Sequence, residues 1–236
     1  MHKEEWHQIT LLHGKHGVPM QLHNIVSYAI TSLVFPAVVL FVRKDPDFTQ
    51  LFERPLLALA TLLWVLHFLR RTAESAWVHR YSKPPAPYVG VLLEYIYYWG
   101  QGGFIAYTLA APDYRFPGPL QLILGVALFA AAETGNAWSH FHLHKLRAPG
   151  ETAHRIPRGG MFERVSSPHY FFEITAWWGF ALAFPCWGTF LFASLTTAIL
   201  LTWGLTRHRS YLRHFDGQEG REMYPKQRRA VLPFLF

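Results

Sequence analysis

Polar and cationic side chains recur at helical spacing near the middle of the chain, a pattern suited to binding phosphate. Asn136, His140, His144 and Arg147 follow one another at steps of four, four and three residues, so one helix face would carry all of them. Arg155 follows in the same polar segment, close to a pair of glycines. Cations and exposed backbone amides together bind phosphate groups well. Such a stripe on a membrane protein would also contact lipid headgroups, and spacing alone leaves both interpretations open.

The histidines of this segment raise the question of a metal site. On a helix only His140 and His144 share a face, whereas His142 points elsewhere. No second cluster of the His-x-x-His-His type follows, and the histidines near the N-terminus belong to a polar tail. The single cysteine, Cys186, excludes a disulfide framework and a cysteine-based metal site. We therefore expect no bound metal.

Ionisable residues also lie in or beside apolar segments, where a buried charge is costly and usually has a function. Glu173 lies one turn after Pro168-His169-Tyr170, near the beginning of such a segment. It would either pair with a cationic or amide group of a cofactor or simply be a carboxylate at a helix N-terminus. Arg70 and Arg71, with His67 one turn earlier, end another apolar segment. They would either anchor the topology or act in a site.

The composition indicates what kind of element must carry these side chains. Of the 236 residues, 51% are hydrophobic, 17% are aromatic and only 16% are charged, whereas a soluble domain has about 25% charged residues. The mean hydropathy is +0.09. These values argue against a disordered chain, a fibrous chain and an ordinary soluble globule.

Six apolar segments approach or reach the roughly 20 residues that a helix needs to cross a bilayer. They are Leu22–Val42, Pro55–Leu69, Tyr88–Ala111, Pro117–Trp138, Tyr170–Cys186 and Trp187–Leu205. The last two are separated only by Pro185-Cys186-Trp187-Gly188, which predicts a tight hairpin. The sequence therefore predicts an all-α membrane bundle of about six transmembrane helices.

The basic residues predict the orientation of this bundle. With six crossings, one side holds only Arg43, Lys44, Arg54 and Arg115, and the other side holds the rest of the 22 Lys and Arg residues. The richer side should be cytoplasmic, and both termini lie on it. The net charge of +7 then needs no nucleic acid as a partner. We expect a polar tail over residues 1–21, without a cleavable signal, and a single transmembrane domain over 22–236.

Several motifs resemble those of the steroid 5α-reductase superfamily. They are Val165–Glu173 (VSSPHYFFE), Trp177-Trp178-Gly179-Phe180, Arg207–Leu212 (RHRSYL), Tyr224-Pro225-Lys226 and Leu232–Phe236 (LPFLF). Within that superfamily the chain most resembles the very-long-chain trans-2-enoyl-CoA reductases. The motifs of that branch are Glu74–Ser82 (ESAWVHRYS), Tyr97–Gly100 (YYWG), Gly135-Asn136 with His140 and Arg147, and Arg155-Ile156-Pro157.

The resemblance implies an all-helical membrane oxidoreductase that takes NADPH from the cytoplasmic side and an apolar lipid substrate from the bilayer. The substrate would be a trans-2-enoyl-CoA or, as a second choice, a 3-oxo-Δ4-steroid or related enone. The membrane would be the endoplasmic reticulum in a eukaryote and the inner membrane in a bacterium. The residues that the resemblance places at the cofactor are Asn136, His140, Arg147, His154, Arg155, Ser166, Glu173, Arg209 and Tyr211.

The sequence departs from the superfamily at the proton donor. Reduction of a conjugated C=C needs a hydride at the β-carbon, a proton at the α-carbon and a donor that stabilises the developing enolate. Steroid reductases use a Glu in an early span and a Tyr in the next, and these positions correspond to Ser27 and Phe68 here. We expect Tyr170, Arg71 or His67 to replace them, with Tyr170 as the first choice. Tyr170 could equally be an interfacial anchor.

Two other functions are compatible with the sequence. Loss of both family donors is also what a non-catalytic relative that binds a cofactor or lipid would show. A membrane methyltransferase shares a Pro-x-Tyr motif after a basic loop, here at 168–170, but lacks the C-terminal Tyr-Pro-Lys and Pro-Phe-Leu-Phe motifs. A preference for NADPH over NADH would favour the reductase.

Overall fold

The computed structural model describes residues 17–43, 54–81, 84–146, 148 and 155–235. In these residues the regular elements are all helices, and β pairing is limited to isolated bridges. The predicted all-α fold is thereby confirmed. The chain divides into two compact units, one up to Arg115 and one from Phe116. The single domain predicted over 22–236 stays a prediction.

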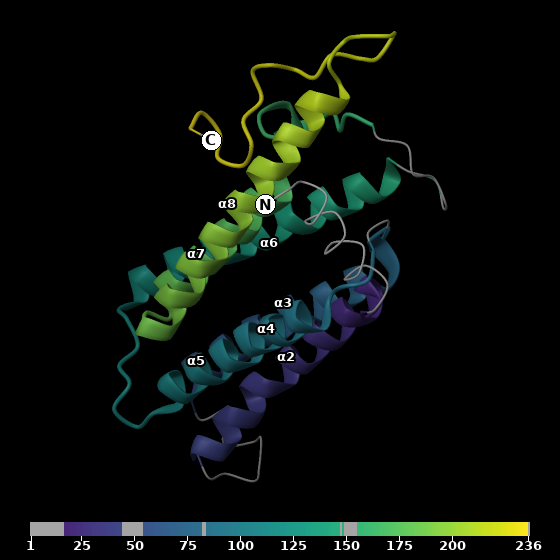
Figure 1. Ribbon diagram of the computed structural model, residues 1–236. Coiled ribbons are helices and arrows are strands. Elements are labelled where there is room, and N and C mark those ends of the chain that lie inside the picture. Colours follow the sequence, from purple (N-terminus) through teal and green to yellow (C-terminus); the bar gives the residue numbers. More distant parts are fainter. Residues whose placement is uncertain (1–16, 44–53, 82–83, 147, 149–154, 236) are drawn as a thin grey trace, which may run out of the picture. The chain divides into compact units, whose positions relative to one another are not determined.

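The first unit contains the helices that precede Arg115 (Figure 1). They are α2 (Met20–Arg43), α3 (Pro55–Ala73), α4 (Tyr88–Tyr95) and α5 (Gln101–Ala110). The π-helical turn η2 (Glu74–Val78) extends α3, and a second π-helical turn, η3 (Ile96–Gly100), joins α4 to α5. The apolar segment that we expected to end at Leu69 is therefore followed by a helix that continues to Val78.

An aromatic core holds the first unit together. Trp64 is fully buried, and its ring lies 4.9 Å from the ring of Phe35 and 4.9 Å from that of Phe68. The indole N–H of Trp64 donates to the backbone carbonyl of Thr31 at 3.1 Å. This bond satisfies the one polar atom of an otherwise apolar side chain, as an interior surrounded by lipid requires.

The second unit contains the helices that follow Phe116 (Figure 1). They are α6 (Pro119–Lys145), the short 3₁₀ turn η4 (Gly160–Glu163), α7 (Pro168–Ala183) and α8 (Trp187–His214). Pro119 and Pro168 lie in the first turns of α6 and α7, where the missing N–H of proline costs nothing. The predicted hairpin at 185–188 is present, and Thr189 caps α8 by accepting the N–H of Cys186 at 3.0 Å.

Small residues and aromatic pairs pack the helices of the second unit. A Cβ atom added at Gly179 of α7 would lie 2.7 Å from the backbone nitrogen of Phe129 in α6, so the two backbones touch there. Close approach at small residues is the usual packing of helices in membranes. Between α7 and α8, the rings of Trp177 and Phe192 meet edge to face at 4.6 Å.

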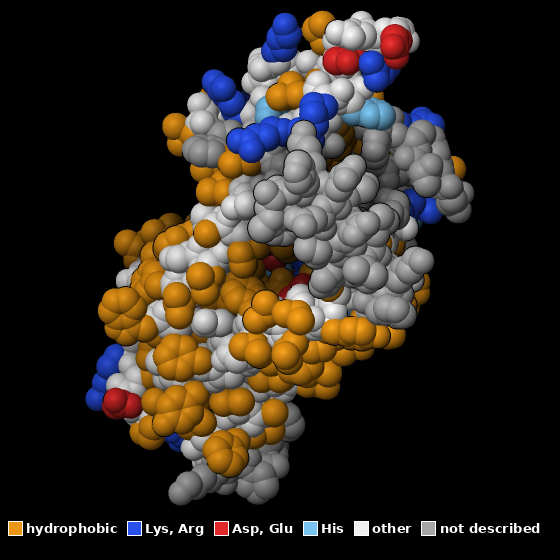
Figure 2. Space-filling view, in the orientation of Figure 1, with side chains coloured by type: hydrophobic (Ala, Val, Ile, Leu, Met, Phe, Trp, Pro, Cys, Tyr) orange, Lys and Arg blue, Asp and Glu red, His pale blue; other side chains and the backbone are white. Residues whose placement is uncertain are grey.

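Four helical segments are long and apolar enough to cross a membrane. They are Met20–Arg43, Pro55–Val78, Pro119–Lys145 and Trp187–His214. The two remaining predicted crossings correspond to the α4–α5 segment and to α7, which has 16 residues. Hydrophobic side chains cover much of the helix surface (Figure 2), and Leu195 and Trp203 of α8 are among the exposed ones. Lipid is the solvent in which such surfaces are stable, so the chain is an integral membrane protein.

Candidate functional site

The C-terminal segment Tyr224–Leu232, which we call the strap, binds the loop that precedes α7. The backbone N–H of Ser166 donates to the carbonyl of Arg229 at 2.8 Å, and that of Ser167 donates to Ala230 at 3.1 Å. Val231 of the strap is fully buried and packs with Leu200 of α8. The strap therefore holds the Ser-Ser-Pro-His-Tyr motif in a fixed position against α8.

A buried arginine anchors the strap to the same loop. Arg228 is 1% exposed, and its guanidinium donates to the carbonyl of Pro157 at 2.7 Å and to the carboxylate of Glu163 at 2.8 Å. The guanidinium carbon also lies 5.5 Å from the centre of the Tyr224 ring. A charge buried this deeply is stable only when it is hydrogen-bonded and paired, as it is here.

The pKa of Glu163, the partner of Arg228, lies below its ordinary value. The backbone N–H of Gly159 donates to its carboxylate at 2.6 Å, and this bond is the main reason why the pKa of Glu163 lies below its ordinary value. Desolvation acts in the opposite direction, and the hydrogen bond and charge of Arg228 add to the lowering of the pKa. Gly159 has a φ of +92°, a conformation that favours glycine.

A chain of hydroxyl groups links the loop, the strap and α8. The hydroxyl of Tyr224 donates to Oγ of Ser166 at 2.7 Å, and Oγ of Ser166 lies 2.6 Å from Nδ1 of His208. Ser166 is 2% exposed. In the structure the hydroxyl of Ser166 connects the strap with α8. That Ser166 also contacts the cofactor stays a prediction.

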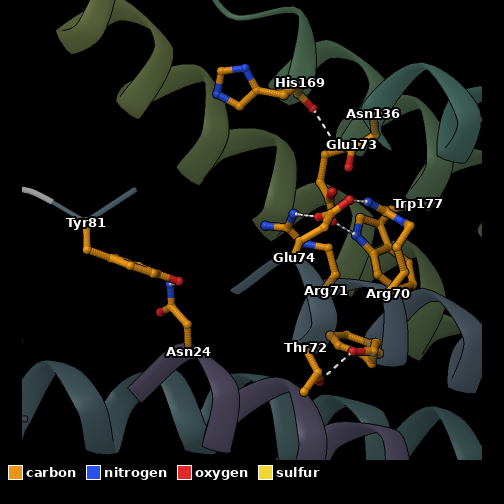
Figure 3. Close-up of polar contacts among 11 residues, drawn as sticks. Asn24, Arg70, Arg71, Thr72, Glu74, Tyr81, Asn136, His169, Glu173 and Trp177 are labelled. Carbon is orange, nitrogen blue, oxygen red and sulfur yellow. Dashed lines mark hydrogen bonds and ion pairs between the residues drawn. The ribbon is translucent and has the colours of Figure 1, made fainter. Parts of the chain in front are cut away.

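The polar face predicted on α6 continues to the end of the helix. Asn136 and His140 are buried, and His144 is half-buried. The side-chain amide of Asn136 donates to the backbone carbonyl of His169 at 2.8 Å (Figure 3), so it fixes the beginning of α7. The rings of His140 and His169 are 5.6 Å apart.

Glu173 has a partner on its own helix. The indole N–H of Trp177 donates to its carboxylate at 3.1 Å (Figure 3), and the two residues are one turn apart on α7. This bond orients the carboxylate of Glu173 toward the next turn of α7. Whether Glu173 also contacts a cofactor stays a prediction.

Tyr170, the first-choice proton donor, lies at the beginning of α7 and faces α8. Its hydroxyl lies 3.5 Å from Nη2 of Arg207, and its ring lies 5.5 Å from the guanidinium carbon of that arginine. The ring of His169 is 4.3 Å away. Tyr170 is half-buried, so part of it is open to its surroundings.

The remaining cofactor candidates lie near the end of α8 or on the loop. Arg155 and Arg209 are exposed, and Lys and Arg side chains gather around this end of α8 and the chain that follows it (Figure 2). Tyr211 stacks on Tyr224 with a ring separation of 5.2 Å. Arg147 and His154 lie outside the described residues.

The candidates of the first unit lie at the end of α3. Glu74, which is 2% exposed, accepts hydrogen bonds from Arg70 and Arg71 (Figure 3). The guanidinium of Arg71 lies over the ring of Tyr28 at 5.3 Å, and His67 is 1% exposed. The pairing with Glu74 gives both arginines a local role, and their role as topology anchors stays a prediction.

Phe68, which the resemblance places at the donor tyrosine of the family, lies in an aromatic cluster. Phe68 is 1% exposed, and its ring lies 6.1 Å from that of Tyr28 and 5.6 Å from that of Tyr98. In the same unit, Nε2 of His23 lies 3.0 Å from the carboxylate of Glu94, which explains a carboxylate in an apolar segment.

Four residues of the second unit that sequence reasoning gave no role hold the candidate site together. They are Arg207, His208, Tyr224 and Arg228. Arg228 looks like any other residue of a basic tail, and nothing in the sequence distinguishes it from the exposed Arg229. Arg207 and His208 belong to the RHRSYL motif and Tyr224 to the YPK motif, so these motifs could have indicated their roles.

Comparisons with known proteins agree with these motifs. Residues 85–236 match the family described as 3-oxo-5-alpha-steroid 4-dehydrogenase. The chain is 33% identical to a very-long-chain enoyl-CoA reductase of Dictyostelium discoideum, over 75% of this chain and 57% of that protein. It is 31% identical to a probable very-long-chain enoyl-CoA reductase of Caenorhabditis elegans, over 77% of this chain and 59% of that protein.

Relatives named for steroids are similar to the chain as well. The human 3-oxo-5-alpha-steroid 4-dehydrogenase 2 is 34% identical to it, over 74% of this chain and 66% of the human protein. The chain thus spans less than two thirds of the length of each of these relatives. The superfamily and its enoyl-CoA reductase branch, both expected from the motifs, are confirmed. The chain belongs to the 3-oxo-5-alpha-steroid 4-dehydrogenase family.

Proposed function

We propose that this chain is a membrane reductase that uses NADPH to reduce a conjugated C=C bond in a lipid. The first candidate substrate is a trans-2-enoyl-CoA, and the second is a 3-oxo-Δ4-steroid or related enone. One observation carries the proposal. The strap and α8 gather Tyr170, Ser166 and Tyr211, all on motifs of the family, around residues 207–211 of α8.

The polar groups of the second unit fit a dinucleotide with an additional phosphate. Arg155 and Arg209 are exposed guanidinium groups, and guanidinium binds phosphate in a bidentate manner. Oγ of Ser167 is buried and has no hydrogen-bond partner among the described residues, so it is available to a ligand. The aromatic face of Tyr211 lies on the same turn of α8 as His208.

NADPH, when bound, supplies the hydride, and the side chains must supply the rest of the chemistry. Tyr170 would give its hydroxyl proton to the substrate as negative charge develops on the conjugated carbonyl. Arg71 and His67 are the alternative donors in the first unit. Arg71 would act by stabilising negative charge rather than by giving up a proton.

The surface of the helices supports a substrate that enters from the bilayer. Apolar side chains such as Leu195 and Trp203 are exposed on α8, the helix that also carries Arg207 and Arg209. An acyl chain or a steroid would partition into the surrounding lipid and reach the site laterally, while the charged cofactor would approach from water.

The proposal is tested by following NADPH absorbance with purified protein in nanodiscs. A panel of trans-2-enoyl-CoA esters of increasing chain length and a set of enone steroids would be offered as acceptors. We expect oxidation of NADPH that depends on one class of acceptor and yields the saturated product. Binding of NADPH without oxidation by any acceptor would overturn the proposal.

A non-catalytic relative is the second candidate, and Phe68 is the observation that favours it. This side chain is buried among Tyr28 and Tyr98, and the resemblance places it at the donor tyrosine of steroid reductases. Such a protein would bind NADPH or lipid but turn over no substrate. The experiment above distinguishes the two functions.

A further inference from the structure

Arg207 on α8 lies directly beside the hydroxyl group of Tyr170 on α7. Nη2 of Arg207 is 3.5 Å from the phenol oxygen, and the guanidinium carbon is 5.5 Å from the centre of the ring. We propose that Arg207 is a positioning residue for Tyr170, which holds the phenol for proton transfer and stabilises the phenolate that the transfer leaves. This inference rests on the proposed function, and in particular on Tyr170 as the proton donor.

Packing around the ring of Tyr170 holds it beside Arg207. A Cβ atom added at Gly204, one turn before Arg207, would lie 3.6 Å from Cδ2 of Tyr170 and would collide with Val231 of the strap. The ring thus fits beside the glycine and next to the strap. Trp203 directly precedes Gly204, and its ring lies 6.4 Å from that of Tyr170. Residues three apart on a helix share a face, so Gly204 makes room for the ring that Arg207 contacts.

A cation at this place favours the proposed step. NADPH, when bound, would supply the hydride for the β-carbon and would become NADP⁺. The O–H bond of Tyr170 breaks, its proton forms the new C–H bond at the α-carbon, and water later returns a proton to the phenolate. A guanidinium within reach of the phenol oxygen lowers the energy of that phenolate and stays charged throughout the cycle.

Arg207 differs from its neighbour Arg209 in the group that it faces. Arg209 is exposed, whereas Arg207 is half-buried and lies against an aromatic ring. If Arg207 instead bound a phosphate of the cofactor, its loss would weaken NADPH binding and leave kcat largely unchanged. A pairing with Tyr170 predicts the opposite, because the charge on the phenol exists only during the reaction.

A double-mutant cycle on the full chain in nanodiscs tests the inference. Arg207→Gln, Tyr170→Phe and the double variant would be compared for kcat and for the KM of NADPH. We expect Arg207→Gln to lower kcat about 10- to 100-fold, with the KM of NADPH changed less than about twofold. In the Tyr170→Phe background the same substitution should change kcat less than about twofold.

Two further variants separate this role from a structural one. Arg207→Lys should recover part of the lost kcat, because it restores the charge without the planar guanidinium. Arg213→Gln removes an exposed arginine of the same helix and should leave kcat unchanged. Losses that multiply in the double variant, or a raised KM with normal kcat, would overturn the inference alone. A wild-type protein that oxidises no NADPH would overturn the proposed function, and this inference with it.

Discussion

The phenol of Tyr170 is the side chain on which the proposed reaction depends most directly. It lies at the beginning of α7, half-buried, with the guanidinium of Arg207 on one side and the ring of His169 on the other. An interfacial anchor would need only lipid headgroups and water around its hydroxyl. A cation at the hydroxyl favours the role of proton donor.

Tyr170→Phe should lower kcat by about 100- to 10,000-fold, the usual contribution of a general acid. The ring packing against Gly204 and Trp203 would remain, so the dissociation constant of NADPH should stay within about twofold of the wild type. Steady-state rates and nucleotide titration of the same preparation measure both quantities. An unchanged kcat would eliminate Tyr170 as the donor and direct attention to Arg71 and His67.

The adjacent arginines Arg228 and Arg229 offer a matched pair for the stability of the strap. Arg228→Ala would leave the carbonyl of Pro157 and the carboxylate of Glu163 without their donor, and it would open space beside Tyr224. We expect a loss of about 3 kcal/mol in the free energy of unfolding. Arg229→Ala, at an exposed side chain, should cost less than about 0.5 kcal/mol. Thermal unfolding in detergent compares the two, and equal losses would contradict the buried anchor.

At the scale of elements, the strap, the loop and α8 depend on one another. Ser166 of the loop is bound by Tyr224 of the strap and His208 of α8, while Arg228 holds the strap to Pro157. Among the described residues, α8 is long and apolar enough to cross a membrane, whereas the loop and the strap are not. Contacts between polar segments therefore shape the part of the second unit where we place the cofactor.

The attachment of the strap should weaken in acid because of Glu163. Its pKa is below the ordinary value of 4.5, first because of the Gly159 N–H and then because of Arg228. As the pH falls, the unfolded chain therefore takes up a proton at Glu163 before the folded chain does. The free energy of unfolding decreases from about pH 4.5 down to the pKa of Glu163 in the folded chain, which lies lower. The thermal midpoint of the wild type should fall more steeply over this range than that of Glu163→Gln.

Glu219→Gln is the control for this pH experiment. The side chain of Glu219 is 84% exposed, so its removal should leave the acid dependence of the wild type intact. A steep fall that persists in Glu163→Gln and disappears in Glu219→Gln would contradict the assignment.

The elements were largely predictable from the sequence, because each depends on local chemistry. Long apolar runs and turn residues indicate the helices and the hairpin at 185–188, and the polar face from Asn136 to His144 lies on one continuous helix. The burial of Arg228 was not predictable. It depends on a carbonyl and a carboxylate that lie 71 and 65 residues away in the chain. The polar run from Arg71 to Tyr81 has helical character, and the helix there continues to Val78.

At the scale of the whole molecule, the distribution of charge predicts how the chain lies in the membrane. All Lys and Arg residues but Arg43, Lys44, Arg54 and Arg115 belong to the side that we expect to be cytoplasmic. The candidate site of the second unit, with Arg155 and Arg209, would then face the compartment that holds NADPH.

The single native cysteine makes this orientation measurable. Cys186 lies between α7 and α8, so a membrane-impermeant maleimide should label it in vesicles that expose the non-cytoplasmic face and not in inverted ones. The double variant Cys186→Ser, Gln218→Cys moves the thiol to an exposed position beyond α8 and should show the reverse pattern. Labelling of both thiols from the same side would contradict the topology.

The affinity for the two nicotinamide nucleotides tests the central claim most directly, because it reports on the cationic groups at the end of the second unit. Titration of the protein in nanodiscs should show NADPH bound at least about tenfold more tightly than NADH. Arg155→Gln or Arg209→Gln should reduce that preference, whereas Arg221→Gln, at an exposed arginine paired with Asp216, should not. Equal affinity for both nucleotides, or no binding of either, would contradict the account.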